Sequence, residues 1–286
     1  MPQIACRAPL NTCHAARKTL SDGTFRGHIS SGHMRSADSS LPITATIEVE
    51  CSSNSAATLT GYFDTLSQAL GPMRWWPART RFEVIVGAIL TQNTSWSNVE
   101  PAIAKLRQAG LLTPRAMETV SIARLGTLIR SSGYFRQKAK KLKAFVRFLR
   151  ADYGGSLTRM FRTPTAELRL KLLAVHGIGP ETADSILLYA GGHTSFVVDA
   201  YTHRILGRHG ITDGKPDYEA VRALFENSLP RDSRTYNEFH ALLVNVGKNW
   251  CRPREPRCSE CPLQRHLPIE PDAASSAGTL TDEVCV

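Results

Sequence analysis

The chain has 286 residues, 42% of them hydrophobic, and a formal net charge of +10. This length allows one large domain or two small ones, and no apolar run reaches the ~20 residues that a membrane-spanning helix needs. Residues 58–265 hold 30 basic and 17 acidic residues, so the positive charge is concentrated in the middle of the chain. An excess of this size on a globular unit favours a polyanionic partner.

Both ends of the chain differ in composition from its middle. Residues 1–57 are rich in Ser, Thr, Ala, His and Gly without a sustained period, so we expect a disordered extension. Its scarcity of acids before Asp22 resembles an organellar transit peptide, and an alternative is a start codon placed too early, with Met34 as an internal start. Residues 266–286 are expected to form a flexible tail. Seven cysteines without an apolar signal region favour a reducing compartment.

From residue 59 onward, apolar residues recur at helical spacing. We expect helices over residues 59–70, 82–91, 98–109, 116–120, 122–131, 136–153, 166–175, 181–190, 200–207, 218–228 and 234–248. Short Gly- and Pro-containing loops separate them, and only residues 195–198 suggest an extended piece. The sequence therefore predicts an all-α fold.

The expected helix at 136–153 is strongly basic. Seven basic residues and no acid occur between residues 134 and 150, interleaved with apolar ones. Lys138 and Lys140 are candidates for contacts with the phosphates of a nucleic acid. The alternative is a solvated helix face.

Residues 175–184 predict a glycine hairpin between two short helices. Gly177 and Gly179 can adopt backbone angles closed to other residues, and Pro180 suits the first position of a helix. The amides of such a hairpin can bind a phosphate, although a tight helical turn with a glycine cap is the plainer interpretation. Further along the chain, Asp199 precedes the expected helix at 200–207, where a capping role alone would also explain it.

The hairpin and Asp199 together resemble a known family. Gly-Ile-Gly-Pro-Glu-Thr-Ala-Asp at 177–184, followed by Val-Val-Asp-Ala-Tyr-Thr-His-Arg at 197–204, resembles the helix-hairpin-helix, Gly/Pro-rich loop and Asp of the endonuclease III superfamily of DNA glycosylases. The likeness extends over residues 59–265. It implies two helical subdomains, 79–190 and 58–78 plus 191–265, with a DNA-binding cleft between them.

The resemblance assigns base excision to this chain. It implies that Asp199 either stabilises the cationic sugar of the transition state or activates the attacking water, and both roles stay open here. Family members that also cut the strand carry a Schiff-base Lys where this chain has Glu181. A carboxylate cannot form an imine, so we expect hydrolysis to an abasic site without lyase activity. Glu181 itself is either catalytic or a favourable acid in the first helical turn.

The substrate expectation rests on tryptophans. Trp75, Trp76 and Trp96 resemble the 3-methyladenine glycosylase branch, and indole faces favour a cationic alkylated purine. Core packing is the alternative role for these rings. An adenine- or thymine/uracil-mismatch glycosylase, an endonuclease III-type enzyme and a non-catalytic helix-hairpin-helix module are the alternative functions. The resemblance further implies that Gln92 fills the gap left by the flipped base and that Gly177, Gly179 and Thr182 contact DNA.

The cysteines near the C-terminus match an incomplete cluster motif. The spacing Cys251-x6-Cys258-x2-Cys261 resembles three ligands of the family's 4Fe–4S loop, but the fourth position holds Leu267, and His266 is the candidate replacement. A labile cluster, a zinc site or no metal are the alternatives. We expect a monomer that acts on double-stranded DNA with a damaged base. We place it in the cytoplasm, associated with the nucleoid, and organellar targeting is the alternative.

Overall fold

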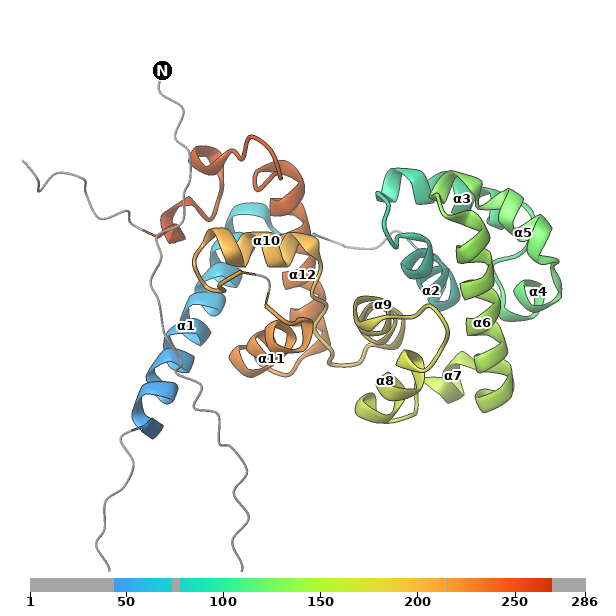
Figure 1. The fold of residues 1–286 in the computed structure, drawn as a ribbon, viewed down its shortest axis with the longest axis horizontal. Coiled ribbons are helices and arrows are strands. Elements are labelled where there is room, and N and C mark those ends of the chain that lie inside the picture. The colour runs from blue at the N-terminus through green and yellow to red at the C-terminus, as the bar shows by residue number, and fades with distance from the viewer. Residues whose placement is uncertain (1–43, 74–77, 215, 269–286) are drawn as a thin grey trace, which may run out of the picture. The chain divides into compact units, whose positions relative to one another are not determined.

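Helices make up the regular structure throughout the part of the chain that the computed structural model describes, residues 44–73, 78–214 and 216–268 (Figure 1). In residues 44–55 the backbone alone is described. No strand occurs within these ranges, which confirms the all-α prediction. Residues 54–267 form a compact unit of their own, distinct from residues 1–53 and 268–286.

The helices follow one another with short loops. The α-helices are α1 (Thr44–Leu70), α2 (Arg81–Leu90), α3 (Trp96–Gln108), α4 (Pro114–Thr119), α5 (Ile122–Leu128), α6 (Phe135–Tyr153), α7 (Leu157–Met160), α8 (Thr165–Leu173), α9 (Pro180–Ser185), α10 (Ala200–Arg208), α11 (Tyr218–Ser228) and α12 (Ser233–Asn249). Short helical turns are η1 (Arg130–Ser132), η3 (Cys258–Glu260) and η4 (Gln264–His266), and η2 (Ile186–Gly191) is a π-helix. None of the described helices combines the length and the apolar character that crossing a bilayer requires.

Some elements differ from the expectation. Helix α1 begins at Thr44 rather than at residue 59. Its first turns were not predicted because their apolar residues do not repeat at helical spacing. The one-turn helix α7 is too short to show a period. Residues 195–198 are buried but form no strand, since no neighbouring strand is available to pair with them in the described chain.

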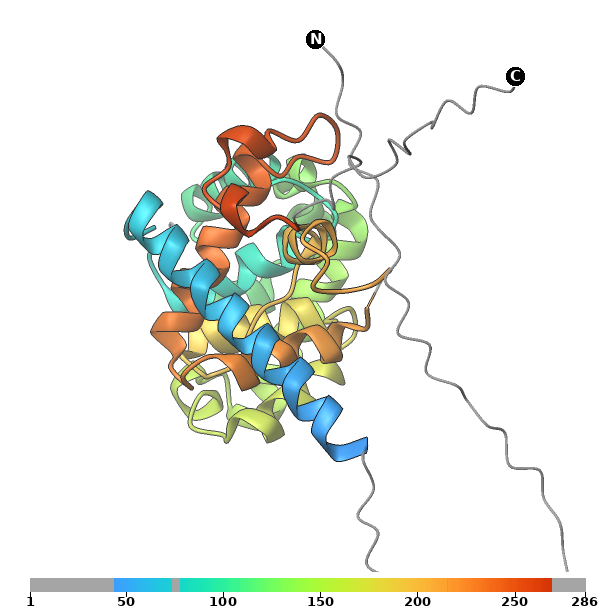
Figure 2. The same ribbon diagram turned by 90° about the vertical axis from the view of Figure 1, so that its left-hand side faces the viewer.

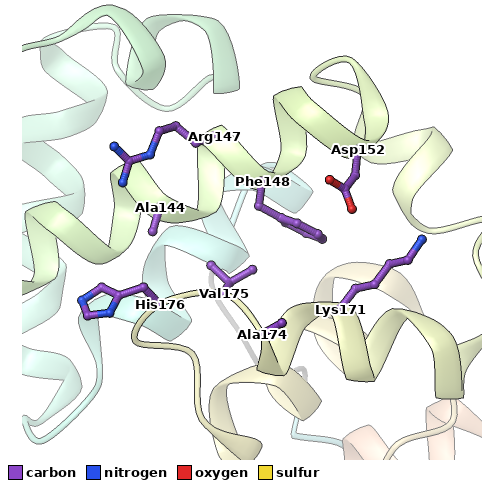
Figure 3. A pocket seen from close by; sticks show the side chains of 8 residues that line it. All are labelled: Ala144, Arg147, Phe148, Asp152, Lys171, Ala174, Val175 and His176. Atoms are coloured by element: carbon purple, nitrogen blue, oxygen red, sulfur yellow. The ribbon is translucent and has the colours of Figure 1, made fainter.

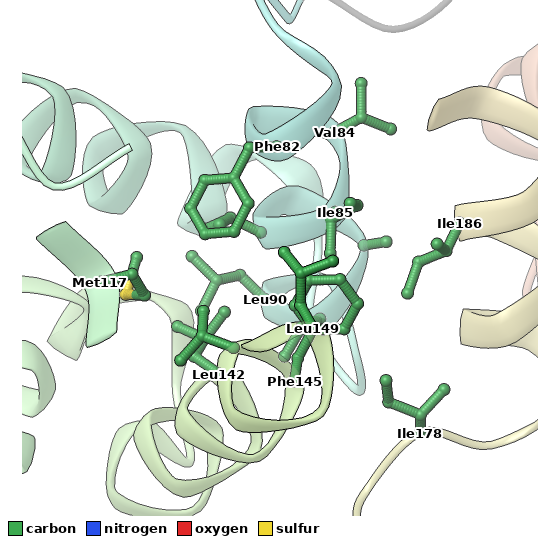
Figure 4. Close-up of a cluster of buried hydrophobic side chains, with 14 of the residues drawn as sticks. Phe82, Val84, Ile85, Leu90, Met117, Leu142, Phe145, Leu149, Ile178 and Ile186 are labelled. Atoms are coloured by element: carbon green, nitrogen blue, oxygen red, sulfur yellow. The ribbon is translucent and has the colours of Figure 1, made fainter. Parts of the chain in front are cut away.

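The first hydrophobic core lies among α2 to α9 (Figure 4). Thr80 is the N-cap of helix α2, and its hydroxyl accepts a hydrogen bond from the Glu83 amide at 3.1 Å. Nearly every side chain of α2 is buried, including Leu90, which packs with Phe145 and Leu149 of α6. This core therefore fixes α2 and α6 beside the glycine hairpin.

The second core contains α1 and α10 to α12 (Figure 2). Leu59, Tyr62 and Leu66 of α1 are fully buried in it. The ring of Phe196 stacks on that of Phe225 with centroids 4.0 Å apart, which holds the segment before α10 against α11.

The segment from α9 through η2 joins the two cores. Ile186 and Leu187 belong to the first core and Leu188 to the second, so η2 is apolar on all sides. A fully buried carboxylate, Asp184, braces the same junction: it accepts hydrogen bonds from Arg169 Nε at 2.8 Å and from the hydroxyls of Ser195 and Tyr218. A buried charge with this many donors is compensated, so the network stabilises the backbone on both sides of the site.

Candidate active site

Asp199 is the N-cap of α10. Its Oδ1 accepts hydrogen bonds from the Thr202 amide at 2.8 Å and from the Thr202 hydroxyl at 3.0 Å. The buried residues Val197 and Val198 lead into it, and its own side chain is 12% exposed. The helix cap thus fixes one oxygen of the carboxylate and aims the other away from α10.

His240 of α12 faces the second oxygen of Asp199. Its Nε2 lies 3.6 Å from Asp199 Oδ2, which is beyond a hydrogen bond, and a protonated imidazole at this distance attracts the carboxylate. The imidazole is 5% exposed, and its Nδ1 is hydrogen-bonded to the hydroxyl of Tyr189. Burial alone would raise the pKa of Asp199, but His240 and the two Thr202 donors outweigh it and lower the pKa below its usual value. Asp199 is therefore held in the ionised form.

Glu181 is the second residue of α9 and faces the same charges. Glu181 is exposed as a residue, and nearby protein atoms partly desolvate its carboxyl group. This desolvation, together with the negative charge of Asp199, raises the pKa of Glu181 to about 7, and His240 opposes the shift. The site thus holds two carboxyl groups, one firmly ionised and one that titrates near neutrality.

Gln92 ties the end of α2 to the glycine hairpin. Its Nε2 donates to the Gly177 carbonyl at 3.0 Å and to the Thr182 hydroxyl at 2.9 Å, and its Oε1 accepts from Lys141 Nζ at 2.5 Å. Gly177 has a φ of +82°, and a Cβ there would come within 2.4 Å of the Lys141 side chain. To enter the DNA, Gln92 would have to leave all three partners, so its wedge role stays a prediction.

Two expected DNA contacts lie inside the protein. Lys138 is 2% exposed, and its Nζ donates to the carbonyls of Leu90 at 2.8 Å and Ser132 at 2.5 Å. The phosphate role of Lys138 is therefore wrong: the ammonium group binds carbonyls at the ends of α2 and η1, and burial lowers its pKa to about 8. Thr182 is also buried, so its hydroxyl supports Gln92 rather than solvent-facing DNA.

Two other expected contacts remain open to solvent. Lys140 is exposed and has neither an ion pair nor a hydrogen bond within the described residues, and Gly179 at the hairpin is exposed as well. Their contacts with DNA stay predictions.

The tryptophan pocket is only partly described. Trp75 and Trp76 lie outside the described residues. Trp96 begins α3 and packs, partly buried, against the first core. The role of all three in a base pocket therefore stays a prediction.

A hollow of about 340 Å³ opens between α6 and α8 (Figure 3). Arg147, Phe148 and Lys171 line it, together with His176 of the hairpin. Neither Asp199 nor any other residue of the carboxylate site lines this hollow, so it is distinct from the site of chemistry.

Tyr134 is an exposed aromatic residue that the sequence reasoning missed. It is 71% exposed and is held in the left-handed region at φ 44°, between η1 and the basic helix α6. Strain of this kind persists where the surrounding structure enforces it and is frequent at ligand contacts. The sequence feature that could have identified Tyr134 is its position directly after Gly133, at the start of a run of basic residues.

The three cysteines meet at one cavity. Cys251, Cys258 and Cys261 line it, and so does Leu267, which offers no ligand atom. Burial raises the pKa of the Cys261 thiol, and the charges of the other two cysteines raise it further. Thiols gathered in this way suit a metal–sulfur group, although no three His, Cys, Asp or Glu side chains of the described chain are arranged to hold a single metal ion.

His266 does not join the cysteines. Its Nε2 lies 2.8 Å from the Thr65 hydroxyl, and its ring packs on Tyr62 with centroids 4.9 Å apart. The expectation that His266 is the fourth ligand is therefore wrong, because its side chain is engaged by α1.

The comparisons with known proteins agree with this geometry. Residues 86–231 match the family described as "HhH-GPD superfamily base excision DNA repair protein". The chain is 46% identical over 196 residues to a Methanocaldococcus jannaschii protein named "Putative DNA repair glycosylase", with 68% of this chain and 88% of that one covered. It is 30% identical over 185 residues to endonuclease III of Thermotoga maritima, with 65% and 81% covered.

Solved structures show the same fold. The H. pylori 3-methyladenine DNA glycosylase bound to 1,N6-ethenoadenine superposes with a TM-score of 0.58 at 28% identity, over 67% of this chain and 96% of that one. A non-covalent endonuclease III–DNA complex superposes with a TM-score of 0.63 at 20% identity, over 74% and 94%. The chain therefore belongs to the HhH-GPD superfamily of base excision repair DNA glycosylases.

Proposed function

We propose that this glycosylase hydrolyses the N-glycosidic bond of an alkylated purine in double-stranded DNA and leaves an abasic site in an uncut strand. The observation that carries the proposal is the pair of Asp199 and Glu181, two neighbouring carboxyl groups whose pKa values are displaced in opposite directions. Such a pair is suited to divide two tasks between two acids.

Asp199 is the electrostatic stabiliser in this proposal. Breaking the glycosidic bond builds positive charge on the sugar, and a fixed carboxylate lowers the energy of that state. The lowered pKa of Asp199 and its two bonds from Thr202 make it a weak base, so stabilisation suits it better than proton abstraction. His240 is a positioning residue that holds Asp199 in the ionised form.

Glu181 is the proton acceptor. A pKa of about 7 is the value that general base catalysis favours at neutral pH, because half of the groups are ionised and each is basic enough to take a proton from water. The water adds its oxygen to the anomeric carbon of the sugar, its proton passes to Glu181, and the base leaves with the bonding electrons. Glu181 later releases the proton to solvent or to the departing base.

The absence of lyase activity follows from the same residue. A Schiff base needs an amine at the position that Glu181 occupies, and a carboxylate cannot supply one. We therefore propose a monofunctional enzyme that acts as a monomer.

The alkylated-purine substrate rests on two further observations. The H. pylori protein with 28% identity is a 3-methyladenine DNA glycosylase. Trp96 begins α3 directly after the loop that holds Gln92, and we propose that its indole stacks on a flipped cationic base.

A substrate panel tests the proposed function. Single-turnover release of free base is measured on otherwise identical duplexes that contain 3-methyladenine, 7-methylguanine, an A·G mismatch, a G·T mismatch or no lesion. The proposal expects release of methylated purines alone. Release only from mismatches would reassign the substrate within the family, and binding without release from any duplex would leave a DNA-binding module.

A further inference from the structure

We propose that His209 completes, with Cys251, Cys258 and Cys261, a binding site for an iron–sulfur cluster. His209 is the C-cap of α10, whereas Asp199 is the N-cap of the same helix. The site therefore lies at the opposite end of α10 from the excision chemistry, and it does not depend on the proposed function.

The four side chains line the same cavity. Its wall includes His209 and the three cysteines, together with Leu267. The cavity is narrow, with a volume of about 20 Å³. Thiolates and imidazole nitrogens are both established ligands of iron–sulfur clusters. An imidazole on this wall can thus replace the donor that Leu267 lacks.

The hydrogen bonds of His209 leave one nitrogen for a metal. Its Nδ1 lies 3.2 Å from the backbone carbonyl of His266 and 2.7 Å from the Tyr62 hydroxyl. In the tautomer that the proposal requires, Nδ1 carries the proton and donates it to this carbonyl, which can only accept, and the lone pair resides on Nε2. This pattern, in which a backbone oxygen fixes the far nitrogen, is the usual orientation of a metal-binding histidine. No hydrogen bond to Nε2 is found among the described residues.

Helix α10 is fastened to the loop that carries the cysteines. Arg204 Nε donates to the Cys251 carbonyl at 2.7 Å, and Arg208 donates to the carbonyls of Arg252 and Pro253. Arg208 also donates to Cys251 Sγ at 3.2 Å. In Figure 1 the end of α10 lies beside the red C-terminal loop. The position of His209 against the sulfurs is therefore fixed by backbone contacts.

A cluster fits this arrangement better than one ion. No described group of three ligand side chains converges on a single ion position, whereas each ligand of a four-iron cluster binds a different iron. On binding, the three thiols lose their protons to solvent, and the neutral imidazole donates the Nε2 lone pair to the fourth iron.

The test is anaerobic reconstitution of the full chain with ferrous iron and sulfide. Iron per chain, visible absorbance and its lifetime in air are measured for the wild type, His209→Ala, His209→Cys and the matched control His266→Ala. The reduced cluster is examined by pulsed electron paramagnetic resonance for coupling to a nitrogen nucleus, with 15N-histidine labelling to identify the nitrogen. Circular dichroism checks that each variant is folded.

The proposal expects a coloured wild type with a histidine nitrogen coupling. His209→Ala should shorten the lifetime in air by ~10-fold or more, and His209→Cys should keep the colour but lose the coupling. His266→Ala should behave as the wild type. A wild type that binds no iron would overturn the proposal, as would a nitrogen coupling that persists in His209→Cys. If His209→Ala does not fold, the comparison of His209→Cys with the wild type decides alone.

Discussion

Replacing Glu181 with Gln should abolish a rise in the excision rate that the wild type shows around neutral pH. The pKa of Glu181 is raised to about 7, so its ionised fraction grows as the pH passes through this value. One unit below the pKa ~10% of the groups are ionised and one unit above ~90%, so a general base predicts a ~10-fold increase over this window. A proton acceptor works only when it is ionised, so the excision rate falls as the pH is lowered through the pKa of Glu181.

The assay is single-turnover excision with enzyme in excess, on the alkylated duplex that is processed fastest. Spontaneous base loss is subtracted at each pH. The Glu181→Gln profile serves as its own control, because titration of the substrate or of any other group would persist in it. A wild-type rate that is flat across neutrality, or a slope that survives in Glu181→Gln, would refute the assignment of Glu181 as the base.

Three further predictions follow from the same structure. Asp199→Asn should lower single-turnover excision by ~10²-fold or more while thermal unfolding changes little, since Asn still caps α10; wild-type turnover would remove Asp199 from the mechanism. Lys138→Met should lower the free energy of unfolding by ~2 to 3 kcal/mol in denaturant titrations, because two buried carbonyls lose a charged donor. The salt dependence of DNA binding should not change, and a weaker salt dependence in the variant would show that Lys138 contacts a phosphate after all. Trp96→Ala should weaken excision of methylated purines by ~1 to 3 kcal/mol of stacking and spare binding to a stable abasic-site analogue; equal losses in both would indicate a packing role.

Much of the helical fold was predictable because most helices carry an apolar face. Helix α12 begins and ends within one residue of its prediction for this reason. The start of α1 and the one-turn α7 were not predictable, since neither presents a repeating pattern. The π-helix η2 was predicted as a continuation of an α-helix, because an apolar run buried on all sides does not reveal its pitch.

The candidate site shows a similar division. Asp199 and Glu181 were found because each follows a local motif. His240 and His209 were not, since they reach their partners from helices far along the chain and have no local signature. Lys138 could have been placed correctly: it lies four residues before Leu142 on the buried face of α6, and that spacing outweighs its charge.

The most direct test of the central claim is the nature of the DNA product. A labelled duplex with an alkylated purine is incubated with enzyme in excess, and the strands are separated with and without alkali, while a parallel reaction contains borohydride. Hydrolysis by the Asp199 and Glu181 pair predicts strands that break only after alkali, with no protein–DNA adduct. Breakage without alkali, together with an adduct trapped by borohydride, would show that an amine of this chain attacks the sugar and would contradict the account.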